Sequence, residues 1–483
     1  MPEIARTSPH APVGARRDQQ TEAKSNRASR RTFLKRSCQY AAATALAAGT
    51  VPHVHAAEDN TIRVALVGCG SRGTGAAAQA LQTKGPIKLW AMADLLSNRL
   101  EGSLKNLSRG LDGRYDRDPT AGLGDRIDVP PERRFIGFDA YRKAIDCLRP
   151  GDLVLDAAVP AFRWVHFRYA IEKGVNFFME KPVAVDGPTC RRMIDLARKS
   201  VEKNLKVAVG LQTRHCRSRR ELLARVQSGE IGEVVAMRAY GLGSGGVTGP
   251  KPEGISELLW QIRNFPCFLW TSGGAYCDYY IHQVDECCWM KGAWPSSVQA
   301  TGGRHYRASG VDQNFDNYAA EYTFPDGAKL HFYVRCMPGC HDENASYAHG
   351  TKGCAVITAP GFLPGRPRIH RGQGFAADKR IWSFPPPEPS PYQFEMNDLV
   401  EAIRQDKPYN EAEDGTIASL VAAMGRMAAH TGQVVTYDEM LNHKHEFAPG
   451  VDKLTLDSPS PLQAGRDGTY PGPQPGILAK REY

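Results

Sequence analysis

The sequence predicts an α/β fold: an N-terminal doubly wound parallel sheet of the Rossmann type, then an α+β C-terminal domain with an open antiparallel sheet. Short apolar runs alternate with helical patterns from residue 61 to about residue 211, which is typical of a doubly wound sheet. A glycine-rich turn also stands between the first expected strand and the first expected helix. After about residue 215 strand-like runs dominate, and we expect them to pair antiparallel.

In the first domain each expected strand is a short apolar run, and each expected helix has apolar residues at helical spacing. The polar residues 101–132 are rich in Gly, Asp and Arg, so we expect an excursion there. The expected strands are Ile62–Val67, Ile87–Ala93, Leu153–Ala158, Val175–Met179 and Lys206–Leu211. The expected helices run from the glycine turn to about Leu81 and over Tyr141–Leu148, Phe162–Lys173 and Pro188–Lys203.

The second domain follows the same criteria and ends at a proline-rich linker, Phe384–Pro391. After the linker, two helical patterns are expected to pack back on the core, the second ending at Gly432 as a helix stop. The expected elements are a helix at Glu221–Ser228, strands at Val234–Tyr240, Ala319–Phe324, Leu330–Val334 and Ala355–Thr358, and helices at Phe394–Arg404 and Ile417–His430. The resulting divisions are 1–56, 57–212, 213–390, 391–440 and a surface tail at 441–483.

Composition excludes several classes of protein. The chain has 483 residues, 42% hydrophobic and 23% charged, which is ordinary globular composition and allows two or three domains. No run of 18 uncharged apolar residues occurs, so a membrane-spanning helix is not expected. Most of the formal charge of +9 lies in residues 1–56, which hold nine Lys or Arg and three Asp or Glu. The remainder shows no basic cluster, so nucleic acid is not an expected partner.

The first 56 residues are typical of an export leader. Ser29-Arg30-Arg31-Thr32-Phe33-Leu34-Lys35 precedes a weakly apolar run, Ala41–Ala48, and a small-residue site at Val54-His55-Ala56. This order resembles the signal of the twin-arginine (Tat) pathway, which exports folded proteins. The resemblance implies that the Tat translocase is a partner, that the mature chain begins near Ala57 and that the protein is periplasmic or otherwise exported.

The twelve cysteines are irregularly spaced and form no CxxC pair, so scattered buried thiols are expected rather than a disulfide framework. Cys336, Cys340 and His341 lie close together, but a fourth ligand is missing. No metal site is therefore expected.

The glycine turn has the spacing of a dinucleotide-binding loop. In Gly68-Cys69-Gly70-Ser71-Arg72-Gly73, the first glycine permits a tight turn, the second a close approach to pyrophosphate and the third close helix packing. The N-terminus of the following helix supplies N–H groups and partial positive charge, so Ser71 and Arg72 join the expected binding loop.

Asp94 ends the second expected strand, 21 positions after Gly73, where a carboxylate accepts hydrogen bonds from ribose hydroxyls. Its charge repels a 2′-phosphate, which favours NAD over NADP. Arg72 and Arg99 are close enough in sequence to keep NADP as an alternative.

Two further motifs carry candidate catalytic groups. Glu180-Lys181-Pro182 ends the Val175–Met179 strand, and ligands of such sheets bind beyond the carboxyl ends of the strands. Downstream of Gly273-Gly274, Asp278 and His282 stand four residues apart, on one face if the segment is helical. A carboxylate beside an imidazole orients the ring and stabilises its charged form. Such pairs also occur as solvated helix pairs.

Together these motifs resemble the glucose–fructose oxidoreductase and inositol dehydrogenase (Gfo/Idh/MocA) family across nearly all of the mature chain. The resemblance implies that 57–212 binds NAD, that 213–390 holds substrate and forms oligomers, and that Lys181, Asp278 and His282 are catalytic. Asp285 matches another frequent family acid, and Glu180 joins the cofactor contacts. Similar segments are Val209–Arg214, Gly229–Gly232 and His349–Gly353. One departure is Val159–Trp164, where many members carry His after the Pro.

The resemblance implies an exported NAD-dependent oxidoreductase that acts on a hydroxyl of a sugar, polyol or glycoside. His282 would remove the hydroxyl proton, Lys181 would stabilise the alkoxide and Asp278 would hold His282. Because the periplasm is expected to lack free nicotinamide, the cofactor would stay bound throughout the cycle. A homodimer or homotetramer paired through the open sheet is also implied. The candidate substrate contacts are Gln212, Arg214, Trp270, Tyr279, Tyr280 and Asp285.

Two alternatives stay open. Some exported relatives are NAD-dependent glycosidases that oxidise C3, eliminate the glycosidic group, add water and reduce again. Such an enzyme would release an aglycone with no net change in NAD. A protein that binds the cofactor without catalysis is the second alternative, and it requires that the Lys, Asp and His side chains do not converge.

Overall fold

The computed structural model describes residues 60–111, 120–245, 248–306 and 310–483. The expected export leader, residues 1–56, lies outside these described residues. Among the described residues, no helix is long and apolar enough to span a membrane.

The first sheet is parallel throughout, as the sequence predicts. Its strand order, β5-β2-β1-β6-β7-β8, is that of a Rossmann fold, in which the order reverses next to β1. The strands are β1 (Ile62–Val67), β2 (Ile87–Asp94), β5 (Arg134–Ile136), β6 (Leu153–Asp156), β7 (Asn176–Met179) and β8 (Val207–Val209).

Helices cover both faces of this sheet because β1 is apolar on both sides. Val64 and Leu66 pack in one core cluster with the helices α2 and α3. Ala65 and Val67 pack in a second cluster with α4, α5 and α6. The helices are α2 (Ser71–Leu81), α3 (Ser97–Arg109), α4 (Ala140–Asp146), α5 (Arg163–Lys173) and α6 (Gly187–Glu202).

The polar stretch from residue 101 contains more structure than expected. α3 extends to Arg109, so the prediction of an excursion was wrong over its first nine residues. Leu100, Ser103 and Leu107 are its buried residues, and this one apolar stripe is sufficient to dock a helix that is otherwise polar. The short strands β3 (Gly110–Leu111) and β4 (Thr120–Ala121) follow.

The second sheet has nine strands in the order β16-β15-β14-β13-β9-β12-β11-β10-β17. It is mostly antiparallel, as the sequence predicts, and β9 and β12 pair parallel. Parallel neighbours need a long crossover connection, and the helices and strands between β9 and β12 provide it. The strands are β9 (Val234–Gly243), β10 (Ser297–Gly303), β11 (Asn317–Thr323), β12 (Lys329–Cys336), β13 (Glu343–Gly350), β14 (Gly353–Thr358), β15 (Arg368–Arg371), β16 (Arg380–Ser383) and β17 (Val435–Thr436).

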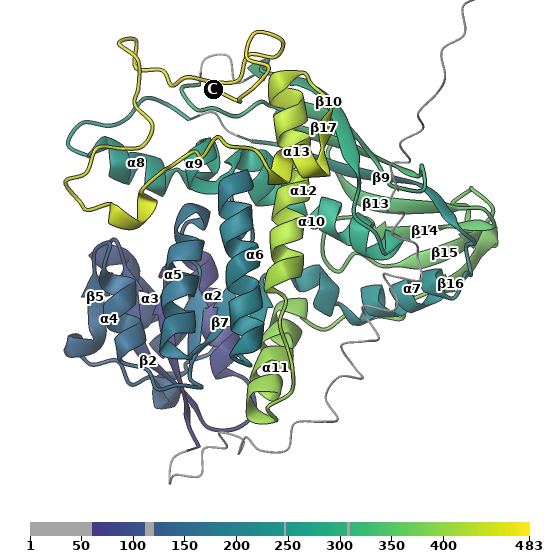
Figure 1. Cartoon of the computed structure of the whole chain (residues 1–483). Coiled ribbons are helices and arrows are strands. Elements are labelled where there is room, and N and C mark those ends of the chain that lie inside the picture. The colour runs from purple at the N-terminus through teal and green to yellow at the C-terminus, as the bar shows by residue number, and fades with distance from the viewer. Residues whose placement is uncertain (1–59, 112–119, 246–247, 307–309) are drawn as a thin grey trace, which may run out of the picture. The chain divides into compact units, whose positions relative to one another are not determined.

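Two long helices connect the sheets. α10 (Gly274–Lys291) packs on β9, β12 and β13, whereas α12 (Ala412–Thr431) packs on β10 and β11 and also on α6 and β8. Figure 1 shows α12 running between α6 and the nine-stranded sheet. α11 (Pro391–Arg404) packs on α2, as expected for a helix that returns to the core. The remaining helices are α7 (Arg217–Gln227), α8 (Glu257–Arg263), α9 (Leu269–Ser272) and α13 (Tyr437–Leu441).

The segment after residue 441 is not only a surface tail, so that prediction was wrong for several of its residues. Tyr470 is 8% exposed and stacks on Trp260 with ring centroids 5.9 Å apart. Glu482 is 3% exposed and forms an ion pair with Arg426 of α12. Interior partners therefore bury parts of a segment whose Pro, Gly and Ser content indicates a surface position.

We expect Gly73→Ala to destabilise the fold, because a Cβ atom there would stand 1.9 Å from the carbonyl oxygen of Gly68. Overpacking of this kind costs about 1–3 kcal/mol. Gly102→Ala in α3 is the matched control, since no atom lies within 4 Å of its Cβ position, and it should be neutral or gain about 0.5–1 kcal/mol. Urea unfolding of both variants measures this, and an equally stable Gly73→Ala protein would contradict the packing.

Candidate functional site

The glycine loop has the geometry that the sequence predicts for a nucleotide cradle. Gly68 has φ +87°, and a Cβ there would stand 2.6 Å from backbone atoms of Ala157 and Ala158, so only glycine fits. At Gly70 the nearest atom to a Cβ is an Arg99 nitrogen at 3.7 Å, which leaves open space in front of the loop. Within the described chain, no side chain caps the N-terminus of α2. The first-turn N–H groups can therefore face an anion.

Asp94 lies at the end of β2 and is fixed against this loop. Its carboxylate accepts hydrogen bonds from the Cys69 N–H at 2.6 Å and the Leu96 N–H at 2.8 Å. Burial raises the pKa of Asp94, while these N–H groups and the Arg99 charge oppose the rise. The loop, the helix terminus and this carboxylate form a cradle that fits a dinucleotide with free ribose hydroxyls.

The Arg72 side chain reaches Glu180, the residue after β7. Its Nε lies 2.5 Å from the Glu180 carboxylate, and its guanidinium lies 4.8 Å from the ring centroid of Tyr392. Glu180 also fills the space beside Gly210, where a Cβ would stand 2.5 Å from Oε2. Arg72 and Glu180, both expected cofactor contacts, thus pair with each other, which weakens the argument for Arg72 as a ligand of a 2′-phosphate. Ser71, the first residue of α2, is exposed.

The structure brings Lys181 and Asp278 together from distant parts of the chain. The Lys181 ammonium follows β7, donates a hydrogen bond to the backbone carbonyl of Asp278 in α10 and lies 3.9 Å from its carboxylate oxygen. Both side chains are mostly buried, at 17% and 8% exposure. Burial raises the pKa of Asp278, and the charges of Lys181 and Arg163 oppose that rise.

His282 lies one turn further along α10, and the structure corrects the role expected for its neighbour. Among the described residues, no hydrogen bond or ion pair joins Asp278 to His282, and the imidazole Nδ1 is buried without a hydrogen-bond partner. The ring packs on Phe362 with centroids 4.9 Å apart. Helical spacing places both residues on one face, but the Lys181 cation attracts the carboxylate instead.

The environment of His282 keeps its imidazole neutral. Burial lowers its pKa well below 6.5, and the positive charges of Lys181 and Arg219 lower it further. Arg219 is itself buried in an ion pair with Glu286, one turn beyond His282, with Nε and Oε2 3.1 Å apart. The neutral imidazole is in the protonation state that a base needs, although burial and the two cations also make it a weaker base.

The sequence analysis missed Arg163 as part of this site. It is 3% exposed and donates hydrogen bonds to the carbonyl oxygens of Ala158, at 2.9 Å, and Pro182. It therefore connects the end of β6 to the residue after Lys181, and its charge acts on Asp278. The available signal was the departure at Val159–Trp164, where an arginine follows the proline by three positions.

Of the expected substrate contacts, several instead bind other side chains. Arg214 and Asp285 form a two-bonded ion pair, at 3.0 and 2.7 Å. Gln212 donates to the Tyr392 hydroxyl at 3.2 Å. Trp270 is fully buried and donates to Gln261 at 2.6 Å, so its assignment to substrate was wrong. Tyr279 is 53% exposed, and the Tyr280 hydroxyl lies 2.7 Å from the Cys336 sulfur.

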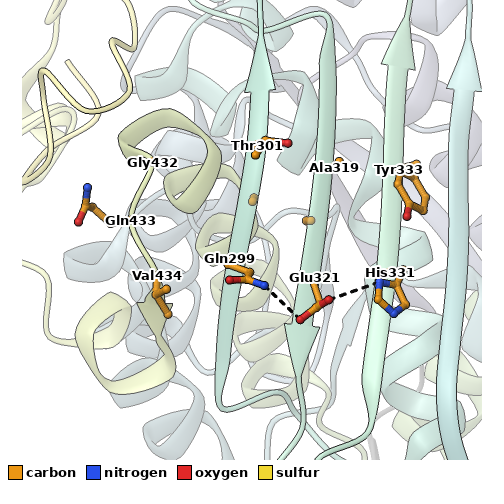
Figure 2. Close-up of a pocket in the computed structure, with 11 residues that line it drawn as sticks. Gln299, Thr301, Ala319, Glu321, His331, Tyr333, Gly432, Gln433 and Val434 are labelled. Carbon is orange, nitrogen blue, oxygen red and sulfur yellow. Dashed lines mark hydrogen bonds and ion pairs between the residues drawn. The ribbon is translucent and has the colours of Figure 1, made fainter. Parts of the chain in front are cut away.

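A surface pocket lies elsewhere, on the outer face of the nine-stranded sheet (Figure 2). It is lined from β10, β11 and β12 and from the turn after α12, and it shares no residue with the expected site. Glu321 in its floor accepts a hydrogen bond from Gln299 and lies 3.7 Å from His331.

Residues 220–356 match the family model described as the GFO/IDH/MocA C-terminal domain. No curated protein sequence matches the chain. The stretch that matches the model follows the parallel-sheet unit, which contains the glycine loop and Lys181.

Solved structures share this two-part fold over most of the chain. Aldose-aldose oxidoreductase from Caulobacter crescentus is 18% identical, with 78% of this chain and 99% of that chain covered and a TM-score of 0.58. Scyllo-inositol dehydrogenase from Lactobacillus casei, solved with NAD(H) and scyllo-inositol, is 19% identical, with 78% and 99% covered and a TM-score of 0.55. UDP-N-acetylglucosamine 3-dehydrogenase from Acidithiobacillus ferrooxidans is 17% identical, with 76% and 98% covered and a TM-score of 0.53. These structures share the fold that the sequence predicts.

We expect Asp94→Ala to shift cofactor preference toward NADP, because it removes a hydroxyl acceptor and a charge that repels a 2′-phosphate. Titration of the nucleotide-free protein with both cofactors, followed by calorimetry, measures the ratio of their dissociation constants. A tenfold or larger change in that ratio is expected, and an unchanged ratio would contradict the assignment. Asp125→Ala, in the turn after β4, controls for loss of one acidic charge elsewhere.

The lowered pKa of His282 predicts a specific dependence of stability on pH. The histidine is neutral in the folded protein but protonates near pH 6.5 when unfolded, so its contribution to stability is present above pH 6.5 and is lost as pH falls. Between pH 6.5 and 5 the loss is up to about 2 kcal/mol. Unfolding free energies at pH 7.5 and 5 should differ less in His282→Gln than in the parent. His341→Gln, at a 78% exposed side chain, should behave like the parent, and equal behaviour of both variants would contradict the assignment.

Proposed function

We propose that this protein is an exported oxidoreductase that transfers hydride between a hydroxyl of a sugar, polyol or glycoside and a tightly held NAD. The observation that carries the proposal is the contact between Lys181 and Asp278 beyond the carboxyl end of β7, where the ammonium lies 3.9 Å from a carboxylate oxygen. His282 lies one helical turn after Asp278. The GFO/IDH/MocA domain supports the reaction class. The structurally similar proteins include an aldose-aldose oxidoreductase and a scyllo-inositol dehydrogenase, which supports the substrate class.

The cofactor would be held by the glycine loop and by Asp94. Gly68 and Gly73 set the loop close to β6 and α2, Gly70 leaves room for a pyrophosphate and Asp94 receives the ribose hydroxyls. NAD bound there would supply the acceptor for the hydride that leaves the hydroxyl-bearing carbon. The carboxylate of Asp94 favours NAD over NADP.

The proton and the developing charge are assigned to the chain's own side chains. His282, neutral because of burial and nearby cations, takes the hydroxyl proton. The ammonium of Lys181 stabilises negative charge on the substrate oxygen as the proton leaves. Asp278 acts on Lys181 rather than on His282, because its carbonyl and carboxylate hold the ammonium in place.

Export supplies a reason for tight cofactor binding. The Arg30-Arg31 signal lies outside the described residues, and its role in twin-arginine transport is part of this proposal. A folded protein can carry its cofactor across the membrane. In a compartment without free nicotinamide, a second substrate must then reoxidise or reduce the same bound molecule.

We also propose that the protein is a homodimer or homotetramer paired through the outer face of the nine-stranded sheet. α10 and α12 cover the other face. On the outer face, the 42% exposed Tyr333 lies opposite Ala319 on the neighbouring strand, and Glu321 lies opposite His331 (Figure 2). A partly apolar sheet face of this kind is typical of an interface.

We expect protein purified from an export-competent host to contain bound NAD(H), and Lys181→Ala and His282→Ala to retain it. Each variant should turn over about 10²–10⁴-fold more slowly on a panel of aldoses, polyols and glycosides, because proton transfer and charge stabilisation are lost. Nucleotide is measured after acid denaturation, and the rate of hydride transfer is measured from the absorbance of the bound cofactor as a single substrate reduces it.

His341→Ala, at an exposed position, is the control and should keep both properties. Nucleotide-free protein that reacts only with millimolar added NAD would contradict tight binding. Release of an aglycone without net redox change would favour the glycosidase alternative, and full turnover in His282→Ala would refute its role.

A further inference from the structure

Arg426 of α12 is fully buried and connects the two segments that carry Lys181 and Asp278. Its Nη1 donates hydrogen bonds to the carbonyl oxygens of Val185 and Gly273, each at 3.1 Å. Val185 follows Lys181 by four residues, and Gly273 is the N-cap of α10. The same nitrogen lies 3.2 Å from the sulfur of Cys277, the residue before Asp278. The Nη1 nitrogen of Arg426 therefore bonds both segments and fixes the distance between them.

Glu482 binds the other two nitrogens of the Arg426 guanidinium. Its carboxylate accepts hydrogen bonds from Nε at 2.9 Å and from Nη2 at 2.7 Å of Arg426. His430, one turn further along α12, lies 2.7 Å from the same carboxylate. Burial raises the pKa of Glu482, but the Arg426 charge and the hydrogen bonds lower it to about 2, so the carboxylate is ionised.

The contacts of Arg426 leave little freedom at the start of α10. A Cβ at Gly273 would stand 2.6 Å from Nη1 of Arg426, so guanidinium and backbone are in close contact. α12 also holds the other segment at a second point, where Ser419 accepts a hydrogen bond from the Val183 N–H at 3.0 Å. A buried guanidinium without its counter-charge would seek another acceptor or water. The contacts to Val185 and Gly273 therefore depend on Glu482.

We propose that Glu482 is a positioning residue, which acts through Arg426 to hold Lys181 and Asp278 at their working separation. The inference rests on the proposed function for its catalytic consequence, whereas its structural consequence can be measured without a substrate. Glu482 contacts neither the glycine loop nor Lys181 among its hydrogen bonds and ion pairs in the described chain.

The test is Glu482→Gln, which keeps the shape and removes the charge. Hydrogen–deuterium exchange of the full-length protein as purified should become at least fivefold faster in peptides covering 181–185 and 273–282. Exchange in the glycine loop, residues 68–73, should stay unchanged. On any sugar that the parent oxidises, kcat should fall at least tenfold with KM within twofold, and Glu482→Asp should recover most of both losses.

Glu446→Gln is the matched control. Glu446 lies in the same C-terminal segment and also forms a two-bonded pair, with Arg192 of α6, at 2.5 and 2.8 Å. Arg192 bonds neither Val185 nor Gly273 among the contacts of the described chain. This variant should leave exchange in both peptides and kcat as in the parent. Unchanged exchange in Glu482→Gln, or an equal increase in Glu446→Gln, would overturn the inference.

A double variant keeps the inference testable if the Glu482→Gln protein does not fold. Glu482→Gln with Arg426→Gln leaves no uncompensated buried charge, so it should fold and still show fast exchange and low kcat. Parent-like exchange in the folded double variant would overturn the inference. If the parent oxidises no sugar, the proposed function fails, and the exchange measurements still decide the role of Glu482.

Discussion

The buried ammonium of Lys181 is the constraint on which the rest of the site depends. A charge removed from water needs close, well-placed partners, and a single unpaired ion in the interior is strongly destabilising. Among the described residues, Lys181 has its partners on α10, in the carbonyl and carboxylate of Asp278. The end of β7 and the first turns of α10 are therefore in contact.

Helix α12 supports this contact between the end of β7 and α10. It packs on α6 and β8 of the first unit and on β10 and β11 of the second sheet, so one helix contacts both units. Two of its polar side chains bond the backbone there: Ser419 bonds Val183, and Arg426 bonds Val185 and Gly273. Arg163 adds a connection within the first unit, between the ends of β6 and β7, by bonding the carbonyls of Ala158 and Pro182.

Most of the secondary structure could be predicted because its signals are local. Apolar runs and glycine spacing placed five of the six strands of the first sheet within one or two residues, but they did not predict β5. Gly68 and Gly73 have the steric roles that their motif predicts. The parallel pairing of β9 and β12 could not be predicted, since both strands have the same sequence character in either direction.

The sequence predicted several of the residues that form the site, but not which of them contact one another. Helical spacing places Asp278 and His282 on one face, but it does not reveal that a cation 97 residues earlier in the chain takes the carboxylate. The burial of Glu482 was equally invisible, because its ion-pair partner, Arg426, lies 56 residues earlier in the chain. Composition describes a segment's average preference, and a single buried ion pair can override it.

The most direct test of hydride transfer at this site follows a deuterium label. Sugars and polyols deuterated at their carbinol carbons are given to the protein with its own bound cofactor, and the nicotinamide is then analysed by mass spectrometry and NMR. The account predicts deuterium on the nicotinamide ring, and much less of it when Lys181 is replaced by alanine. Label that passes to solvent without reaching the nicotinamide, from a substrate that is nonetheless converted, would contradict it.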